Sequence, residues 1–280
     1  MNHKLKNGII IGTGTITFVF VLLWAIGLFD AHNPLDSNTD EVELNIQFHQ
    51  LNSSELITDE SQFNTYFESQ PELLDFLSTN YKKYHSNDST SFFETWKSFY
   101  KQDYVIQTEQ EIKNIFPNFN KESKDLLESM KRLKFHFPDK KYPKQIIFTN
   151  TNFGGNVYLE KGIIIVGVER YIGGNKDVIQ KSLPPDEFPQ WLKTGFENKY
   201  LYRDIVMSSL LYNNTIPKSS TEYLIDKIIE WGKLCVLTEM ALRLNNEDVN
   251  PEIVLRWTNA QFNWAEENEK SFWSYLKKNE

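Results

Sequence analysis

The chain has 280 residues, of which 40% are hydrophobic and 24% are charged, and its formal net charge is −8. This composition suits one large domain or two small ones and excludes a wholly disordered chain. Acidic and basic residues are interleaved without a basic stripe, which argues against a nucleic-acid binder. Cys235 is the only cysteine, so an intramolecular disulfide and a thiolate zinc cluster are excluded.

The N-terminal segment is apolar, and residues 8–29 carry no charged side chain. A helix crosses about 30 Å of hydrocarbon with about 20 apolar residues, so this segment is predicted to be a membrane anchor. It is longer than the core of a cleaved signal peptide and is followed by a poor cleavage site, so we expect it to stay uncleaved. Lys4 and Lys6 precede it and Asp30 follows it, which predicts a single-pass inner-membrane protein with its C-terminal domain in the periplasm.

Residues 30–41 are polar and rich in turn-forming residues, so we expect a short linker between an anchor at 1–29 and a folded domain at 42–280. The domain begins with "VELNIQF", whose alternating apolar residues predict a half-buried strand. Three amphipathic patterns then predict helices. They are "PELLDFLSTNYKKY", "STSFFETWKSFYKQD" and "KESKDLLESMKRLKFHF".

The middle of the chain changes character, because three short β-rich runs follow one another with glycine-containing turns between them. This arrangement predicts a small antiparallel meander. After Pro189 the sequence shows only helical patterns, so we expect no further strand there. The β-rich runs are 145–149, 156–160 and 163–169, and the helical runs are 190–212, 221–244 and 250–278. We therefore predict an α+β fold, mostly helical, rather than alternating βαβ units.

The last helical run is rich in aromatic residues. Trp257, Trp264 and the stretch 268–276 recur on nearly one helical face. Large aromatic side chains are most often buried, so we expect Trp264 and Trp273, with Phe262 and Phe272, to lie in the core rather than to form a surface for stacking sugars.

The glycines at the end of the last β-rich run raise the question of a phosphate-binding loop. Gly167, Gly173 and Gly174 fit neither the dinucleotide-binding spacing nor the P-loop spacing. Lys176 is followed by Asp177 rather than by serine or threonine. We expect these glycines to permit a positive φ where a strand leaves the sheet.

The histidines argue against a zinc enzyme. None of the five histidines forms an i, i+4 pair, and none follows His136 in the sequence. We expect His136 to lie at the end of a helix, and a functional role for this single histidine stays open. The sequence also lacks a D-x-D-x-D-G calcium loop and a G-x-S-x-G nucleophile motif. We therefore expect no cofactor, no metal and no catalytic residues.

Four runs in the second half of the chain together resemble the GldB family, the gliding-motility-associated lipoproteins of Bacteroidota. The runs are "IIIVGVERYIGG", "SLPPDEFPQWLKTGFENKYLYRDIVMSSL", "YLIDKIIEWGKLCVLTEMAL" and "QFNWAEENEKSFWSYL". The motif residues are Gly167, Gly173, Gly232, Trp264, Asn268, Glu269 and Trp273. The resemblance covers roughly residues 40–280. It implies a protein of the cell envelope without established enzymatic activity, whose partners are other proteins of the gliding machinery.

The GldB family in turn looks like a distant relative of the zincin-type metallopeptidases, which bind zinc through H-E-x-x-H on one helix and a ligand on a later helix. The corresponding segments here read "YRDIVMSSLLY" and "IEWGKLC", so the zinc ligands are absent. The resemblance implies a zincin-like scaffold without zinc. In the place of the metal we expect a charge cluster of Glu169, Arg170, Asp204 and Lys233, with Asp204 and Lys233 paired across two facing helices.

Two features depart from the pattern of the family. No cysteine follows the N-terminal apolar run, so lipidation is in doubt, and a lipoprotein-like envelope location is the alternative to the membrane helix. The resemblance implies relatives that continue beyond the position of Glu280, so we expect either a short copy or a core that lacks a closing segment.

Three functions are compatible with the sequence. The favoured one is a non-enzymatic, membrane-anchored periplasmic component that binds other proteins of a gliding or secretion apparatus. The second is a peptide- or glycan-binding protein that uses the cleft of the former peptidase. The third is a hydrolase with an unrecognised site. The sequence does not name the partner, because surface complementarity is not written as a motif.

Overall fold

The computed structural model describes residues 35–51, 53–82, 91–212, 215 and 223–279. The chain divides into two compact units, Met1–Asp36 and Ser37–Glu280, and the fold described below is that of the second unit. The predicted membrane anchor at 8–29 lies outside the described residues. Within the described ranges, no helix is both long enough and apolar enough to cross a membrane.

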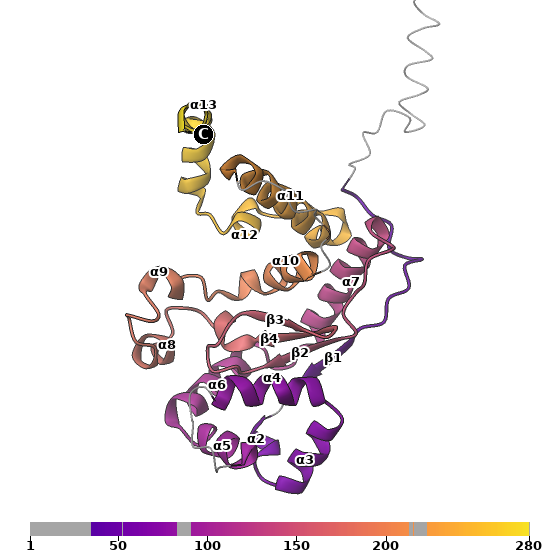
Figure 1. Ribbon diagram of the computed structural model, residues 1–280, viewed down its shortest axis with the longest axis vertical. Coiled ribbons are helices and arrows are strands. Elements are labelled where there is room, and N and C mark those ends of the chain that lie inside the picture. The colour runs from indigo at the N-terminus through magenta and orange to yellow at the C-terminus, as the bar shows by residue number, and fades with distance from the viewer. Residues whose placement is uncertain (1–34, 52, 83–90, 213–214, 216–222, 280) are drawn as a thin grey trace, which may run out of the picture. The chain divides into compact units, whose positions relative to one another are not determined.

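A four-stranded mixed sheet lies at the centre of the second unit, with the strand order β1-β2-β4-β3 (Figure 1). The strands are β1 (Gln47–Gln50), β2 (Gln145–Thr149), β3 (Val157–Glu160) and β4 (Ile163–Gly167). Strands β1, β2 and β4 run parallel to one another, and β3 pairs antiparallel with β4 at one edge. The prediction of an α+β fold is confirmed, and the prediction of a purely antiparallel sheet is wrong.

The burial of β3 and β4 accounts for the strand order, which differs from that of the predicted meander. Every residue of β4 is buried, as expected for a strand that has neighbours on both sides, whereas all of β3 is only partly buried. A turn at Lys161 and Gly162, with φ of 45° and 90°, joins the two strands into a hairpin. Because β4 and not β3 takes the interior place beside β2, the pairing of β2 with β4 is parallel.

The N-terminal helices cover one face of the sheet (Figure 1). They bury a cluster of aromatic rings in which Phe63, Phe67 and Trp96 contact one another. Ile147 of β2 and Ile165 of β4 belong to the same cluster, which ties these helices to the sheet. The helices are α2 (Ser53–Leu56), α3 (Glu60–Glu68), α4 (Pro71–Lys82), α5 (Phe92–Phe99) and α6 (Asp103–Ile115).

Three longer helices lie on the other side of the sheet (Figure 1). They are α7 (Asn120–His136), α10 (Leu201–Tyr212) and α11 (Leu224–Leu242), and all three contact one another. Buried Arg132 of α7 donates to the carbonyl of Met240 at 3.1 Å and to the amide oxygen of Asn246 at 2.7 Å. Helix α10 also packs on the edge strand β3, and this contact positions the polar network described below.

Shorter elements complete the fold. They are η1 (Val168–Tyr171), α8 (Asp177–Ser182), α9 (Gln190–Lys193), η2 (Asn198–Tyr200), η3 (Leu244–Asn246), α12 (Pro251–Leu255) and α13 (Asn259–Asn279). The predicted helical run at 190–212 is therefore divided into α9, η2 and α10. The run at 250–278 is divided into α12 and α13 by Arg256, whose φ of 56° cannot continue a right-handed helix.

Candidate functional site

The segment that leaves β4 carries the first of the predicted site residues, Glu169. Its side chain is fully buried, and one carboxylate oxygen accepts hydrogen bonds from Thr151 N–H at 3.0 Å, Thr151 Oγ1–H at 2.7 Å and Phe153 N–H at 2.8 Å. Burial raises the pKa of Glu169, and these hydrogen bonds oppose the rise. Glu169 therefore holds the loop after β2, in which Asn152 and Phe153 have positive φ.

The glycines beside this segment are required for two different reasons. Gly173 has a φ of 100°, as expected for a residue that permits a left-handed turn. Gly167 instead has a φ of −77°, and a Cβ atom there would lie 2.3 Å from the Gly155 carbonyl oxygen and 2.6 Å from Thr151 Oγ1. The prediction of a positive φ is thus confirmed at Gly173 and wrong at Gly167 and Gly174. At both of the latter positions a Cβ atom would collide with neighbouring backbone, at Gly174 with the Lys193 carbonyl oxygen 1.8 Å away.

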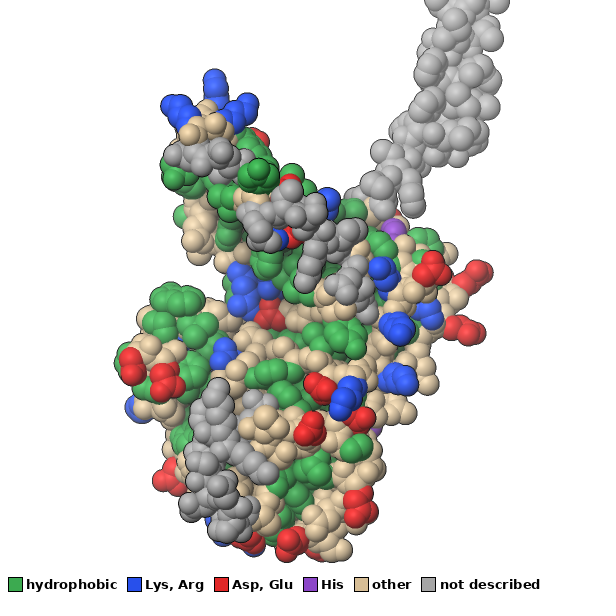
Figure 2. Space-filling view, viewed as in Figure 1, with side chains coloured by type: hydrophobic (Ala, Val, Ile, Leu, Met, Phe, Trp, Pro, Cys, Tyr) green, Lys and Arg blue, Asp and Glu red, His purple; other side chains and the backbone are tan. Residues whose placement is uncertain are grey.

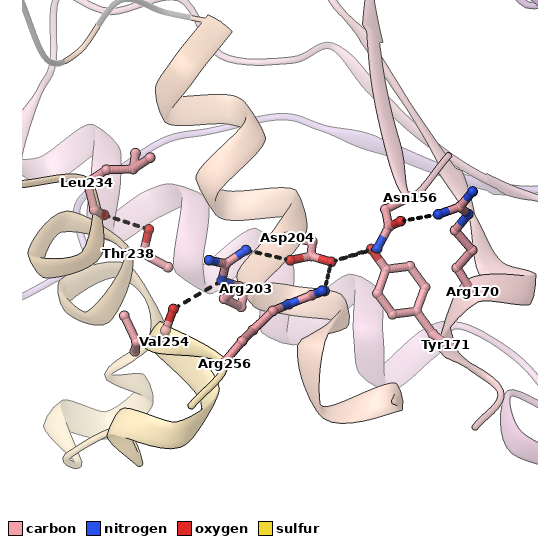
Figure 3. Close-up of polar contacts among 9 residues, drawn as sticks. All are labelled: Asn156, Arg170, Tyr171, Arg203, Asp204, Leu234, Thr238, Val254 and Arg256. Atoms are coloured by element: carbon pink, nitrogen blue, oxygen red, sulfur yellow. Dashed lines mark hydrogen bonds and ion pairs between the residues drawn. The ribbon is translucent and has the colours of Figure 1, made fainter. Parts of the chain in front are cut away.

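Asp204 lies at the centre of a polar network between β3, η1, α10 and α12 (Figure 3). Its side chain is 8% exposed. One oxygen accepts from Asn156 at 3.0 Å, from the Tyr171 hydroxyl at 2.9 Å and from Arg256. The other oxygen accepts from Arg203 at 2.9 Å. Four donors from separate parts of the fold therefore hold one buried carboxylate.

The donors of this network are themselves fixed in place. Arg203 Nε donates to the Val254 carbonyl at 3.1 Å, which links α10 to α12. The Arg256 guanidinium lies 4.5 Å from the centre of the Tyr200 ring. Burial, together with the neighbouring Asp204 charge, raises the pKa of Tyr171 well above its ordinary value, so its hydroxyl stays protonated and donates.

Arg170 extends the network toward the loop after β2. It donates to the Asn156 amide oxygen at 3.2 Å and to the Phe153 carbonyl. Its guanidinium lies 5.2 Å from the centre of the Phe196 ring and 5.7 Å from that of Phe188. Arg170 and Asp204 are therefore connected through Asn156, while Glu169 belongs to the neighbouring loop.

The predicted ion pair between Asp204 and Lys233 is wrong. Asp204 does face inward, as its helical position suggested, but Lys233 is exposed on α11 and the partners of Asp204 are Arg203 and Arg256. The apolar periodicity of α11 suggested that Lys233 faces inward, but periodicity does not show which part of a helix is covered by the rest of the chain. Sequence reasoning missed Arg256 because it reaches Asp204 from a left-handed position 52 residues later.

The tryptophans of α13 are exposed, so the prediction that they lie in the core is wrong. Trp264 is 63% exposed, Phe272 is 42% exposed and Trp273 is 38% exposed. Trp257, Ala260, Gln261, Trp264 and Ala265 line a surface pocket of about 520 Å³. Figure 2 shows hydrophobic side chains at the surface of α13, with a group of basic side chains at its far end. The burial of these aromatic side chains was expected because large aromatic residues are most often buried, but the sequence pattern did not indicate which part of the chain would cover them.

A second apolar surface lies on α11. It consists of Ile229, Gly232 and Val236, which we call the α11 surface. Ile229 is 46% exposed and Val236 is 49% exposed. Gly232 lies between them on the same side of the helix, and a Cβ atom there would have no atom within 4 Å. Nothing within the described parts of the chain therefore requires glycine at this position.

The remaining predicted motif residues form hydrogen bonds within α13. Asn268 donates to the Trp264 carbonyl at 2.8 Å, and the Trp273 indole donates to Glu269 at 3.2 Å. These contacts join residues four positions apart along one helix and lie at the surface. Over the described ranges, no three histidine, cysteine or acidic side chains are grouped to hold a metal ion.

Comparison with known proteins identifies the family of this chain. A family model described as gliding motility protein GldB matches residues 32–280, which is most of the chain. No curated protein and no solved structure matches it. The match includes the Asp204 network, both apolar surfaces and all of the motif residues, and the chain therefore belongs to the GldB family of gliding motility proteins.

Proposed function

We propose that this chain is a non-enzymatic component of the gliding machinery, located in the cell envelope, which binds another protein of that machinery through the α11 surface. Membership of the GldB family supports the process and the envelope location. The apolar segment at 8–29 supports attachment to the inner membrane with residues 30–280 in the periplasm, and attachment through a lipid is the alternative.

Gly232 is the observation that carries the binding proposal. A glycine in the interior of a helix costs about 0.5–1 kcal/mol relative to alanine, and here no neighbour within the described chain requires it. Small residues let two helix backbones approach closely. Ile229 and Val236 flank the glycine at helical spacing and remain about half exposed. This combination fits an apolar helix of another protein lying across α11.

The state of Asp204 supports a structural rather than a catalytic role for the polar network. A general base needs an oxygen that can reach a substrate, and four donors from this chain already occupy both oxygens of Asp204. Arg203 and Arg256 balance its charge. A zinc measurement and a peptidase assay on the purified chain separate this proposal from the hydrolase alternative.

The glycan-binding alternative has one observation in its favour, the pocket between Trp257 and Trp264. Sugar sites combine an aromatic face with polar groups that receive the hydroxyls. Among the described residues that line this pocket, Gln261 alone carries a hydrogen-bond acceptor in its side chain, and this oxygen already accepts from Thr258 N–H at 2.9 Å. We therefore rank this alternative below protein binding.

A single substitution tests the proposal. Gly232→Leu adds a side chain where the described chain leaves open space, so the fold should be retained while a helix is kept away from the α11 surface. Lys227→Leu is the matched control, because it adds the same side chain at an exposed position on a different side of α11. Full-length variants are expressed in cells that lack the native protein.

Two readouts decide the outcome. We expect Gly232→Leu to abolish gliding and to lose one co-purifying envelope protein, while Lys227→Leu retains both. Thermal unfolding of the purified variants should show that Gly232→Leu is at least as stable as the parent chain. Normal gliding and an unchanged set of co-purifying proteins in Gly232→Leu would contradict the proposal.

A further inference from the structure

Arg203 and Arg256 together carry more positive charge than Asp204 neutralises. Their side chains are only 10% and 30% exposed, and both pair with the single carboxylate of Asp204. Within the described chain, no other carboxylate forms an ion pair with either guanidinium. A buried charge is costly unless it is paired. The charge of Asp204 is balanced, but one positive charge at the edge of the network lacks a counter-ion.

Arg256 is the arginine that has donors to offer. A guanidinium has several N–H donors, and among the described residues Arg256 donates only to Asp204, through Nη2. Its Nε is buried without an acceptor. Figure 3 shows Arg256 reaching Asp204 from the end of α12, on the side away from Asn156 and Tyr171. The outer edge of the guanidinium, which carries Nη1, is free to donate to a second acceptor.

The position of this guanidinium is fixed by the fold. Arg256 has a φ of 56°, and residues other than glycine seldom adopt this conformation, which is often found where a protein binds a ligand. The Tyr200 ring lies 4.5 Å from the guanidinium. Glu252 of α12 does not neutralise it, because Glu252 pairs with Lys199 at 3.2 Å. The free edge of Arg256 is therefore both oriented and unneutralised.

Gly195 keeps the approach to Arg256 Nη1 clear. Glycine is not required here by the backbone, because Gly195 is not among the described residues with a positive φ. A Cβ atom at this position would lie 3.3 Å from Arg256 Nη1 and 3.2 Å from the Leu192 carbonyl oxygen. Figure 2 shows basic side chains in the hollow between the part of the molecule that contains α12 and the part that contains α9. The missing side chain leaves space beside the guanidinium.

We propose that Arg256 Nη1, beside Gly195, binds a carboxylate group of a ligand. The Arg256 guanidinium then bridges two carboxylates, with Nη2 on Asp204 and Nη1 on the ligand. Hydrogen bonds between arginine and carboxylate are short and strong because both groups are charged. The charges of Arg203 and Arg256 are then matched by those of Asp204 and the ligand.

A phosphate group fits this site less well than a carboxylate. Phosphate sites combine several N–H donors, often at the N-terminus of a helix, whereas this site offers one edge of one guanidinium. A doubly charged phosphate would also exceed the single unmatched positive charge, and it would lie close to the negative charge of Asp204. The carboxylate site does not depend on the α11 surface, so either proposal can fail alone.

An NMR titration of the full-length chain in detergent tests the site. The Nε–H signal of Arg256, identified by its absence in Arg256→Lys, is followed while sodium acetate replaces sodium chloride at constant ionic strength and neutral pH. We expect acetate to shift this signal until it saturates. Gly195→Ala should weaken acetate binding about tenfold, as expected for the loss of one hydrogen bond to a charged group. Asn198→Ala, at an exposed position of the same segment, is the control and should bind as the parent does.

Thermal unfolding gives a second readout that does not need the Gly195 variant. A ligand that binds only the folded state raises the midpoint of unfolding. Acetate should raise the midpoint of the parent chain more than that of Arg256→Lys, which keeps the charge beside Asp204 but lacks the second guanidinium nitrogen.

Two larger probes identify the source of the carboxylate. N-acetylaspartic acid amide offers the carboxylate of an acidic side chain, and N-acetylalanine offers that of a chain end. We expect at least one of them to displace acetate.

Four results would overturn the proposal. They are an Arg256 signal that does not respond to acetate, inorganic phosphate that binds more tightly than acetate, an acetate affinity that is unchanged in Gly195→Ala, and an equal rise of the midpoint in the parent chain and Arg256→Lys.

Discussion

At the scale of single residues, the Asp204 carboxylate joins segments that are distant in the sequence. Asn156 follows the loop after β2, Tyr171 ends η1, Arg203 lies on α10 and Arg256 follows α12. Sequence reasoning placed Asp204 on an inward face from helical spacing alone. It could not find these partners, because three of the four lie outside α10 and their approach depends on loop geometry.

Asp204→Ala should destabilise the fold strongly. The substitution leaves two arginines and a buried tyrosine hydroxyl without their acceptor, and breaking a buried charge pair on one side costs about 3–5 kcal/mol. Lys233→Met should change the free energy of unfolding by less than about 0.5 kcal/mol, because Lys233 is exposed. Urea unfolding of both variants and of the double variant measures this. Non-additive effects would show that Lys233 does interact with Asp204.

Glu169 should make the stability of the fold depend on pH. Burial raises its pKa in the folded state above the ordinary value of 4.5, so the native state binds a proton more tightly than the unfolded state. The stabilisation is present below pH 4.5 and is lost as the pH rises through the folded pKa. Glu169→Gln keeps one oxygen for the three donors and should remove this part of the pH dependence.

Urea unfolding at pH 5 and pH 8 measures the effect. The free energy of unfolding of the parent chain should fall more between the two values than that of Glu169→Gln. Burial also raises the pKa of Glu109, so the variant should reduce the pH dependence rather than abolish it. A parent chain and variant with parallel pH profiles would show that Glu169 titrates as it does in water.

At the scale of elements, the sequence was sufficient where a pattern reports a local property. It predicted α7, α10 and α11 from their apolar periodicity, and β2, β3 and β4 from their β-rich runs. It did not predict the strand order, because the interior position of β4 depends on burial on both sides. It also failed for α13, whose amphipathic pattern is compatible with burial against the chain or against a partner.

Two tryptophans separate these cases experimentally. Trp96 is fully buried among aromatic rings, so Trp96→Ala should cost about 3–5 kcal/mol. Trp264 is 63% exposed, so Trp264→Ala should change the free energy of unfolding of the monomer by less than about 1 kcal/mol. Denaturation at low protein concentration measures both. A loss of several kcal/mol at Trp264 would mean that α13 packs into the core after all.

At the scale of the whole molecule, the membrane anchor at 8–29 stays a prediction, and the family match concerns the folded unit. The GldB family match over residues 32–280 covers the folded unit and places its work in gliding motility. The resemblance of the family to zincin peptidases stays a prediction. Family membership could be predicted from motifs in the sequence, whereas the exposure of the α11 surface and of the α13 tryptophans could not, because it depends on how the helices pack.

Site-specific photo-cross-linking in living cells tests most directly whether the α11 surface binds another envelope protein. A photoreactive phenylalanine analogue is placed at Val236, which is 49% exposed, and at Lys227 as the control position. We expect one heavier adduct at Val236, containing an envelope protein other than this chain, and no such adduct at Lys227. No adduct at Val236, or an adduct only with a second copy of the chain, would contradict it.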